Sequence, residues 1–112
     1  MLDKNCVFCR IVRGELPSAK VYEDDKTIVF GDLAPKAKTH LLAVPKDHFK
    51  LLEELNEERA QTLAHILLKI PEIAKANGCE NGYRLIVNQG DDANQTVHHL
   101  HIHILGGEKL PE

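Results

Sequence analysis

A stretch near the C-terminus, with four histidines within six positions, decides how we expect the chain to fold: Val97-His98-His99-Leu100-His101-Ile102-His103-Ile104-Leu105. Alternate side chains of a β-strand lie on the same face of the sheet, at intervals of about 6.6 Å. If this stretch is one strand, then His99, His101 and His103 share one face. His98 lies on the other face with three aliphatic side chains (Leu100, Ile102 and Ile104) that supply a buried surface. The stretch therefore predicts a strand that is buried on one side and presents three imidazoles in a row on the other.

Three explanations compete for this row of imidazoles. An alternating strand needs only polar residues on its outer face, but three histidines in three such places are improbable by chance. Three histidines on one strand can instead chelate a catalytic zinc ion, although no general base stands out close in sequence. One imidazole can also act as a nucleophile positioned by the others, because neutral imidazole, with a pKa of ~6.5, remains basic near pH 7. The residues alone leave the last two explanations open.

Composition narrows the class of protein. The chain has 112 residues, 43% of them apolar and 28% charged, which suits a single domain over 1–112. No apolar run approaches the ~20 residues of a membrane span, and residues 1–5 lack the apolar stretch of a secretory signal. A formal charge of -3 argues against a duplex nucleic-acid binder. Three cysteines, an odd number, argue against a disulfide scaffold, so we expect a soluble, cytoplasmic protein without a membrane partner.

Outward from the histidine stretch, further β-prone runs alternate with turn signals. We expect strands over residues 19–22, 27–30, 40–44, 83–87 and 97–105. Because the last two runs are close in sequence, they should pair antiparallel. The pattern predicts an α+β fold with a five-stranded antiparallel sheet.

Two helical patterns complete the fold. Residues 6–13 carry apolar side chains at helical spacing, which predicts a short N-terminal helix. Asn56 is the expected N-cap of one long helix, with two glutamates in its first turn, where the helix dipole favours negative charge. The apolar stripe of that helix is expected at Leu63, Ile66, Leu67 and Ile70.

Cys6 and Cys9 form a pair separated by two residues. A redox pair would follow a strand, and nothing before Cys6 can form one. Thiolates at this spacing are better suited to half of a tetrahedral zinc site, which then requires two further ligands. Two buried free thiols remain the alternative.

The residues also resemble a known family. The run His99-Leu100-His101-Ile102-His103-Ile104-Leu105 matches the signature of the histidine-triad (HIT) family. Other matching segments stand in the family's order: Phe30-Gly31-Asp32-Leu33-Ala34-Pro35, Thr39-His40, Val44-Pro45-Lys46, His48, Asn88-Gln89-Gly90 and Gln95-Thr96-Val97. Gly106-Gly107 after the triad is similar to the Hint-like branch, the nucleoside phosphoramidate hydrolases. The resemblance implies a HIT-like fold whose sheet continues across a homodimer.

The resemblance also implies a reaction and the residues that perform it. His101 would attack the α-phosphorus of a nucleoside monophosphate derivative and form a nucleotidyl-histidine that water hydrolyses. The implied catalytic residues are His101, His99, His103, His40 and Thr96. The implied substrate-binding residues are Asp32 for the ribose, Asn88 for the phosphate, Gln95, and, around the base, Val7, Phe8, Ile11, Phe30, Leu33 and Leu42. The ligand would be a purine nucleoside monophosphate or its phosphoramidate, and no magnesium is required.

In the same resemblance, His48 and His99 join Cys6 and Cys9 in a structural zinc site. Thr96 replaces the commoner serine, His98 replaces a frequent aromatic residue, and the chain ends sooner after Gly107 than is usual. Two other functions therefore stay open at this stage. One is a zinc-stabilised nucleotide-binding or scaffold module with incidental turnover. The other is a dinucleoside polyphosphate hydrolase or nucleotidyl transferase.

Overall fold

The structure is a computed structural model that describes residues 4–112. In chain order its elements are α1 (Val7–Val12), β1 (Lys20–Glu23), β2 (Thr27–Gly31), β3 (Thr39–Pro45), η1 (Leu52–Glu54), α2 (Glu57–Ala76), β4 (Tyr83–Ile86), η2 (Asp91–Ala93) and β5 (Ile102–Gly106). The five strands form one sheet in the order β1-β2-β3-β5-β4, and every neighbouring pair is antiparallel. The predicted α+β class and the five-stranded antiparallel sheet are confirmed.

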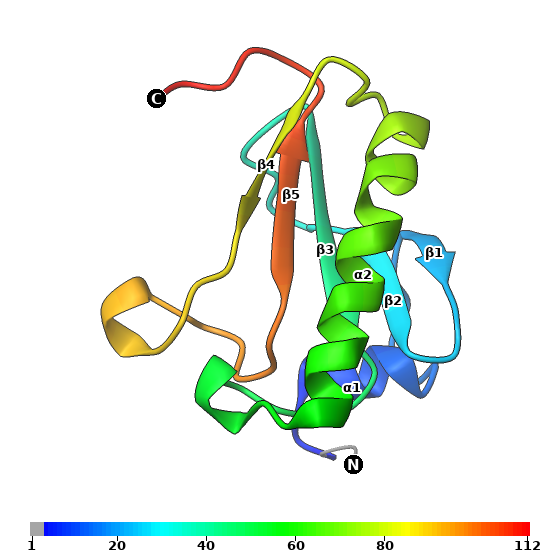
Figure 1. Cartoon of the computed structure of the whole chain (residues 1–112). Helices are drawn as coiled ribbons and strands as arrows, with labels where there is room; N and C mark the ends of the chain where they lie inside the picture. Colours follow the sequence, from blue (N-terminus) through cyan, green and yellow to red (C-terminus); the bar gives the residue numbers. More distant parts are fainter. Residues whose placement is uncertain (1–3) are drawn as a thin grey trace.

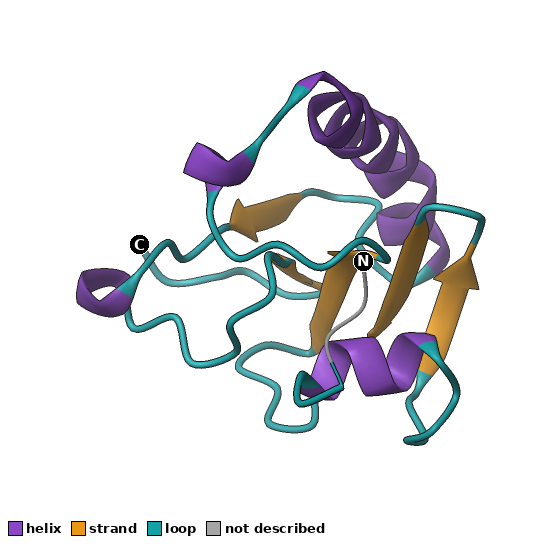
Figure 2. Cartoon of the chain, turned by 90° about the horizontal axis from the view of Figure 1, so that it is seen from below, coloured by secondary structure: helices purple, strands orange, loops and turns teal. Residues whose placement is uncertain are grey.

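The two helices cover opposite faces of the sheet. Figure 2 shows α2 above the strands and α1 below them. The side chains of β3 alternate accordingly: Leu41 and Ala43 belong to the core cluster under α2, whereas Leu42 and Val44 belong to a second cluster that includes Phe8 of α1. A strand with cores on both faces needs apolar residues that point to both of them, which β3 provides at the four consecutive positions from Leu41 to Val44.

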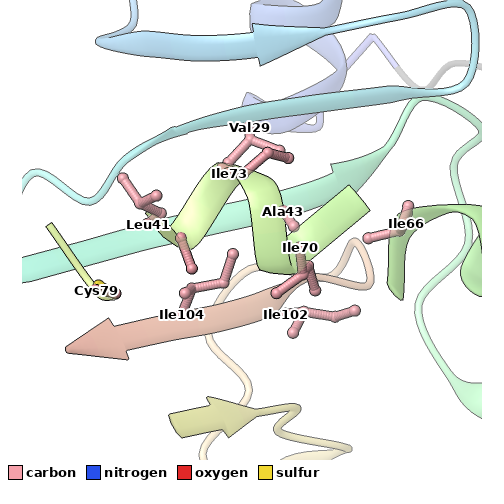
Figure 3. Close-up of a cluster of buried hydrophobic side chains, with 10 residues drawn as sticks. Val29, Leu41, Ala43, Ile66, Ile70, Ile73, Cys79, Ile102 and Ile104 are labelled. Atoms are coloured by element: carbon pink, nitrogen blue, oxygen red, sulfur yellow. The ribbon is translucent and has the colours of Figure 1, made fainter. Parts of the chain in front are cut away.

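The larger core lies between α2 and the sheet. Asn56 caps the helix, because its side-chain oxygen accepts a hydrogen bond of 2.8 Å from the Arg59 N–H. The buried stripe that faces the sheet is Thr62, Ile66, Ile70 and Ile73, and it meets Ile102 and Ile104 of β5 (Figure 3). Leu67 was expected in this stripe, but it is 50% exposed. It follows Ile66 directly, so the 100° turn between successive residues carries it out of the interface.

The histidine stretch differs from its prediction at the N-terminal end. β5 begins at Ile102 rather than Val97, so His99 and His101 stand on an irregular segment that leads into the strand. The Leu100 N–H donates a 2.7 Å hydrogen bond to the Phe49 carbonyl instead of joining the sheet. His98, expected on the core face, is exposed. The alternation of the aliphatic side chains persists, because Leu100, Ile102 and Ile104 are all buried.

β5 lies between β3 and β4 (Figure 1), and its His103 is on the α1 face of the sheet because its partner Leu42 belongs to the cluster with Phe8. His103 pairs with Leu42 of β3 on one side and with Ile86 of β4 on the other. Within residues 4–112, no helix combines the length and apolar character that crossing a membrane requires.

Candidate functional site

One cavity collects nearly all the predicted catalytic and substrate-binding side chains. It has a volume of about 410 Å³. Of the predicted residues it is lined by Val7, Phe8, Ile11, Phe30, Asp32, Leu33, His40, Leu42, Asn88, Gln95, Thr96, His101 and His103. His99 is the predicted catalytic residue that does not line it. A more open cavity of about 520 Å³ lies between the turn after α2 and the C-terminal residues, and it contains none of these side chains.

The ring of His101 is held in one tautomer by the main chain. Its Nδ1 lies 2.7 Å from the carbonyl oxygen of His99. Because a carbonyl oxygen can only accept, Nδ1 must carry the proton, and Nε2 keeps its lone pair. The ring is buried, and the edge of the Phe8 ring packs against it with centroids 5.1 Å apart. Burial lowers the pKa of His101, which favours the neutral ring. His101 therefore offers a nucleophilic nitrogen, Nε2, in a cavity wall.

His40 and His103 form a hydrogen-bonded relay beside His101. The Lys36 main-chain N–H donates to His40 Nδ1 at 3.1 Å, so the proton of the neutral His40 ring stands on Nε2. His40 Nε2 lies 2.9 Å from His103 Nδ1 and donates to it. His103 then carries its own proton on Nε2. Asn88 Nδ2, which lies 3.4 Å away, is also a donor, so the two groups do not bond each other and both can face a third group in the cavity. The relay presents an N–H donor next to the ring of His101.

Burial keeps both relay rings neutral. It is the main cause that lowers the pKa of His103 to about 4, with smaller contributions from His101 and His40. Burial also lowers the pKa of His40, although Asp32 opposes the shift. The rings therefore act as neutral hydrogen-bond donors and acceptors near pH 7.

Asp32 sits at the edge of this relay. One of its carboxylate oxygens accepts the Ala34 N–H at 2.8 Å, and the other lies 3.4 Å from His40 Nε2. Ligand atoms of Asp32, His40 and His103 lie within 4.8 Å of one another, which is close enough to consider a metal ion. A metal would need a lone pair on His40 Nε2, but the Lys36 N–H places the proton there. The donor pattern of these three residues suits a hydrogen-bond relay and does not fit a metal site.

A second cluster, Cys6, Cys9, His48 and His99, does have the donor pattern of a metal site. Its four ligand atoms lie within 4.8 Å of one another, and four of their six separations are 3.2 to 3.6 Å. Tetrahedral zinc with N and S ligands would separate them by about 3.3 to 3.8 Å. His99 Nε2 lies 2.7 Å from the Pro45 carbonyl oxygen, so the ring proton is on Nε2. The lone pair of His99 Nδ1 then faces the thiols. The residues present fit zinc.

This cluster corrects the prediction of three imidazoles in one cleft. The ring of His99 is fully buried among the cluster residues rather than in the cavity. The irregular backbone before β5 removes the strict two-residue alternation at this position. His99 contributes to the cavity through its carbonyl oxygen, which orients the ring of His101.

Two other predicted residues lie in the cavity wall in unexpected roles. Gln95 is 4% exposed, and its amide is already engaged: it accepts from the Gly90 N–H at 2.9 Å and donates to the Lys50 carbonyl at 3.1 Å. It holds the loop that carries Thr96. Leu33 is 98% exposed and supplies only an outer rim to the cavity.

Sequence reasoning missed Lys36, which lines the cavity and whose main-chain N–H sets the tautomer of His40. Its position in the loop between Asp32 and His40, two residues already assigned to the site, was the available signal. The role of its main-chain N–H has no signature in the sequence.

Fold and site together define an α+β protein with a histidine-lined cavity on one face of its sheet and a Cys/His cluster beside it. Residues 5–110 match the family model described as "Scavenger mRNA decapping enzyme C-term binding". The chain is 45% identical over 102 residues to "Protein HitA" of Neisseria gonorrhoeae, covering 91% of this chain and 95% of that one. It is 38% identical over 110 residues to a "14 kDa zinc-binding protein" of Zea mays, covering 96% and 86% of the two chains.

Solved structures agree with these relatives. A histidine triad protein from Clostridium difficile superposes with a TM-score of 0.94 at 46% identity, covering 100% of this chain and 98% of that chain. A HIT family hydrolase from Clostridium thermocellum superposes with a TM-score of 0.93 at 45% identity, covering 98% and 96%. The chain belongs to the HIT family, as the sequence motifs indicated, and its fold is the HIT fold.

The neutral state of His103 can be tested by NMR. We expect its ring signals, assigned with a His103→Asn variant, to titrate with a midpoint near pH 4 rather than at the usual ~6.5. Because folding favours the neutral ring, the unfolded chain binds more protons between these two values. This ring therefore makes the fold less stable as pH falls from ~6.5 toward the folded pKa. A midpoint at the ordinary value would contradict the relay described above.

Proposed function

We propose that this protein is a nucleotide hydrolase that cleaves nucleoside 5'-phosphoramidates, or related derivatives of nucleoside monophosphates, through a covalent intermediate on His101. The observation that carries the proposal is the pairing of two ring nitrogens on one cavity wall. His101 Nε2 offers a lone pair and His103 Nε2 offers a proton, and the two rings pack with centroids 5.0 Å apart. A nucleophile beside a donor is the arrangement that phosphoryl transfer needs.

In the proposed reaction, His101 Nε2 attacks the α-phosphorus and forms an N–P bond while the P–N bond to the leaving amine breaks. The amine takes up a proton from solvent as it departs, and the hydroxyl of Thr96, exposed at the cavity wall, is the proposed guide for that proton; the water that attacks in the second step returns one proton to solvent. Water then attacks the nucleotidyl-histidine, its oxygen bonds to phosphorus, and the N–P bond breaks to release the nucleoside monophosphate and the free ring. Each step has a lower barrier than direct hydrolysis.

The neighbouring groups supply the stabilisation that this reaction requires. The His103 Nε2–H and the Asn88 amide are placed to bind the phosphoryl oxygens as their negative charge increases. The Pro45 carbonyl accepts a hydrogen bond from the His99 ring, and the His99 carbonyl accepts one from the His101 ring. Because these bonds fix both rings, little reorganisation is needed when the proposed nucleophile reacts.

The other end of the cavity suits a nucleoside. The Asp32 carboxylate can accept hydrogen bonds from both ribose hydroxyls. Around it stand the apolar side chains Val7, Phe8, Ile11, Phe30 and Leu42, with Leu33 at the rim. An apolar slot of this kind buries a base without reading its hydrogen-bonding edge, and we propose a purine nucleoside monophosphate as the unit recognised.

Replacing the nucleophile tests the reaction. His101→Ala should lower the rate of amine release from an adenosine phosphoramidate by at least about a thousand-fold, because no other group on the cavity wall can form the covalent intermediate. His98→Ala, which removes an exposed histidine from the same segment, should leave the rate within about two-fold. Mass spectrometry of the rapidly quenched wild-type enzyme should show a chain that carries one nucleotidyl group. Full activity of His101→Ala would refute the mechanism.

We propose that Cys6, Cys9, His48 and His99 bind a structural zinc ion. All four positions of the tetrahedron would be filled by side chains, so the ion would supply rigidity rather than an activated water. When bound it would neutralise the paired thiolates. The thiols of Cys6 and Cys9 must stay reduced to bind a metal ion. Because the cytosol keeps thiols reduced, this requirement supports the proposal of a cytoplasmic location.

Metal analysis tests the zinc site. Protein purified without chelator should contain about one zinc per chain, and Cys6→Ser should lose most of it because three ligands bind zinc far more weakly than four. Cys79→Ala is the matched control: Cys79 is buried in the other core cluster, so this variant should keep its zinc. Wild-type protein without stoichiometric zinc would remove the proposal.

We also propose that two chains form a homodimer through the β4 edge. All four residues of β4 are exposed, and exposed apolar side chains continue to Val87. The opposite edge, β1, begins with Lys20 and ends with Glu23, charges that discourage edge pairing. Pairing β4 with its copy would join the two sheets and cover an apolar edge.

The oligomeric state tests this proposal. Sedimentation should show a dimer for the wild type and a monomer for Leu85→Lys, because the new charges would face each other across the interface. Val21→Lys introduces the same charge on the β1 edge, at a residue of similar exposure, 41% against 38% for Leu85. This control should remain dimeric. A monomeric wild type, or equal behaviour of the two variants, would contradict the β4 interface.

A further inference from the structure

Lys36 stands out in the cavity because of its charge. The ionisable side chains that line the cavity are Asp32, Lys36, His40, His101 and His103. His40 and His103 each accept a hydrogen bond on Nδ1, so those nitrogens carry no proton and the two rings are neutral. His101 must be neutral to act as the nucleophile proposed above. The ammonium of Lys36 is therefore the one fixed positive charge in the described cavity wall, set against one negative charge, Asp32.

The placement of Lys36 is defined by two further observations. Its main-chain N–H is bonded to His40 Nδ1, which anchors the residue at the relay. Its charge acts on both relay rings and opposes their protonation. Its side chain is exposed, and it makes no ion pair with a carboxylate among residues 4–112. An ammonium that is within electrostatic range of the histidines and has no internal partner is available to an anionic ligand.

We propose that Lys36 is the residue that recognises the negative charge of the substrate, so that the site selects ligands that carry phosphate over uncharged nucleosides. The inference rests on the proposed function, because it assigns the phosphate of the nucleotide to the His101–His103 end of the cavity. Neutral imidazole N–H groups can orient phosphate oxygens, but they add no net charge. Without Lys36, Asp32 would be the only charge in the cavity wall and would repel the anion.

The contribution of Lys36 to binding affinity should grow with the negative charge of the ligand. Adenosine is uncharged, a monophosphate carries about two negative charges near pH 7, and a diphosphate carries more. A Coulombic contribution from one exposed ammonium scales with that charge and weakens as salt increases. A contribution from packing of the lysine stem would be equal for all three ligands and independent of salt. These two expectations separate charge recognition from simple contact.

The test is calorimetric titration of adenosine, AMP and ADP into the wild type and four variants, at low and high salt. Lys36→Ala should weaken AMP binding by about 5-fold and ADP binding more, while changing adenosine binding less than about 2-fold. Lys36→Glu should weaken AMP and ADP binding further, and Lys36→Arg should bind them as the wild type does. High salt should reduce the differences in affinity between the variants and the wild type. All variants keep the main-chain N–H that bonds His40.

Lys38→Ala is the matched control. Lys38 lies two residues further along the same exposed loop, changes the net charge equally, and does not line the cavity. It should leave all three affinities within about 2-fold. Equal effects of the Lys36 and Lys38 variants, or equal losses for adenosine and AMP, would overturn the role of Lys36 while leaving the nucleotide site intact. A wild type that binds none of the three ligands would overturn both this inference and the proposed function.

Discussion

Two main-chain carbonyl oxygens determine what the central histidines can do. The Pro45 carbonyl fixes a proton on Nε2 of His99, and the His99 carbonyl fixes a proton on Nδ1 of His101. Because a carbonyl can only accept, the two rings expose opposite nitrogens. His99 presents Nδ1 to the thiols of the Cys/His cluster, and His101 keeps Nε2 for the cavity. Residues 99–101 therefore contribute to two chemically different sites, the Cys/His cluster through His99 and the cavity through His101.

The fold could be predicted from the sequence because it depends on local patterns, whereas most of the site residues were implied by the resemblance to the HIT family. The alternation of histidine and aliphatic residues in the last strand can be read from the sequence, and so can the two-residue spacing of Cys6 and Cys9. The start of β5 was not predictable in this way. The Leu100 N–H bonds the Phe49 carbonyl, a contact between residues far apart in sequence, and it bends the chain before the strand begins. This bend exposes His98 and sends the His99 ring to the cluster instead of the cavity.

Main-chain groups account for most of what the sequence could not reveal about the site. The tautomer of His40, and through it that of His103, depends on the N–H of Lys36, a group that every residue except proline has. The amide of Gln95 is likewise used by main-chain groups of its own loop and of Lys50. Sequence motifs indicate which side chains come together. Which ring nitrogen of each histidine carries the proton depends on the main-chain groups around it.

Helix α1 joins the two sites mechanically. It has six residues, too few to be stable alone, so it depends on tertiary contacts. Cys6 and Cys9 bring it to the cluster, and between them Phe8 packs its ring against His99 at 5.8 Å and His101 at 5.1 Å, measured between centroids. Whatever stabilises the cluster also holds Phe8, and Phe8 packs against the ring of His101. Because the His101 ring packs on Phe8 and is bonded to the His99 carbonyl, a cluster outside the cavity can still govern how precisely His101 is placed.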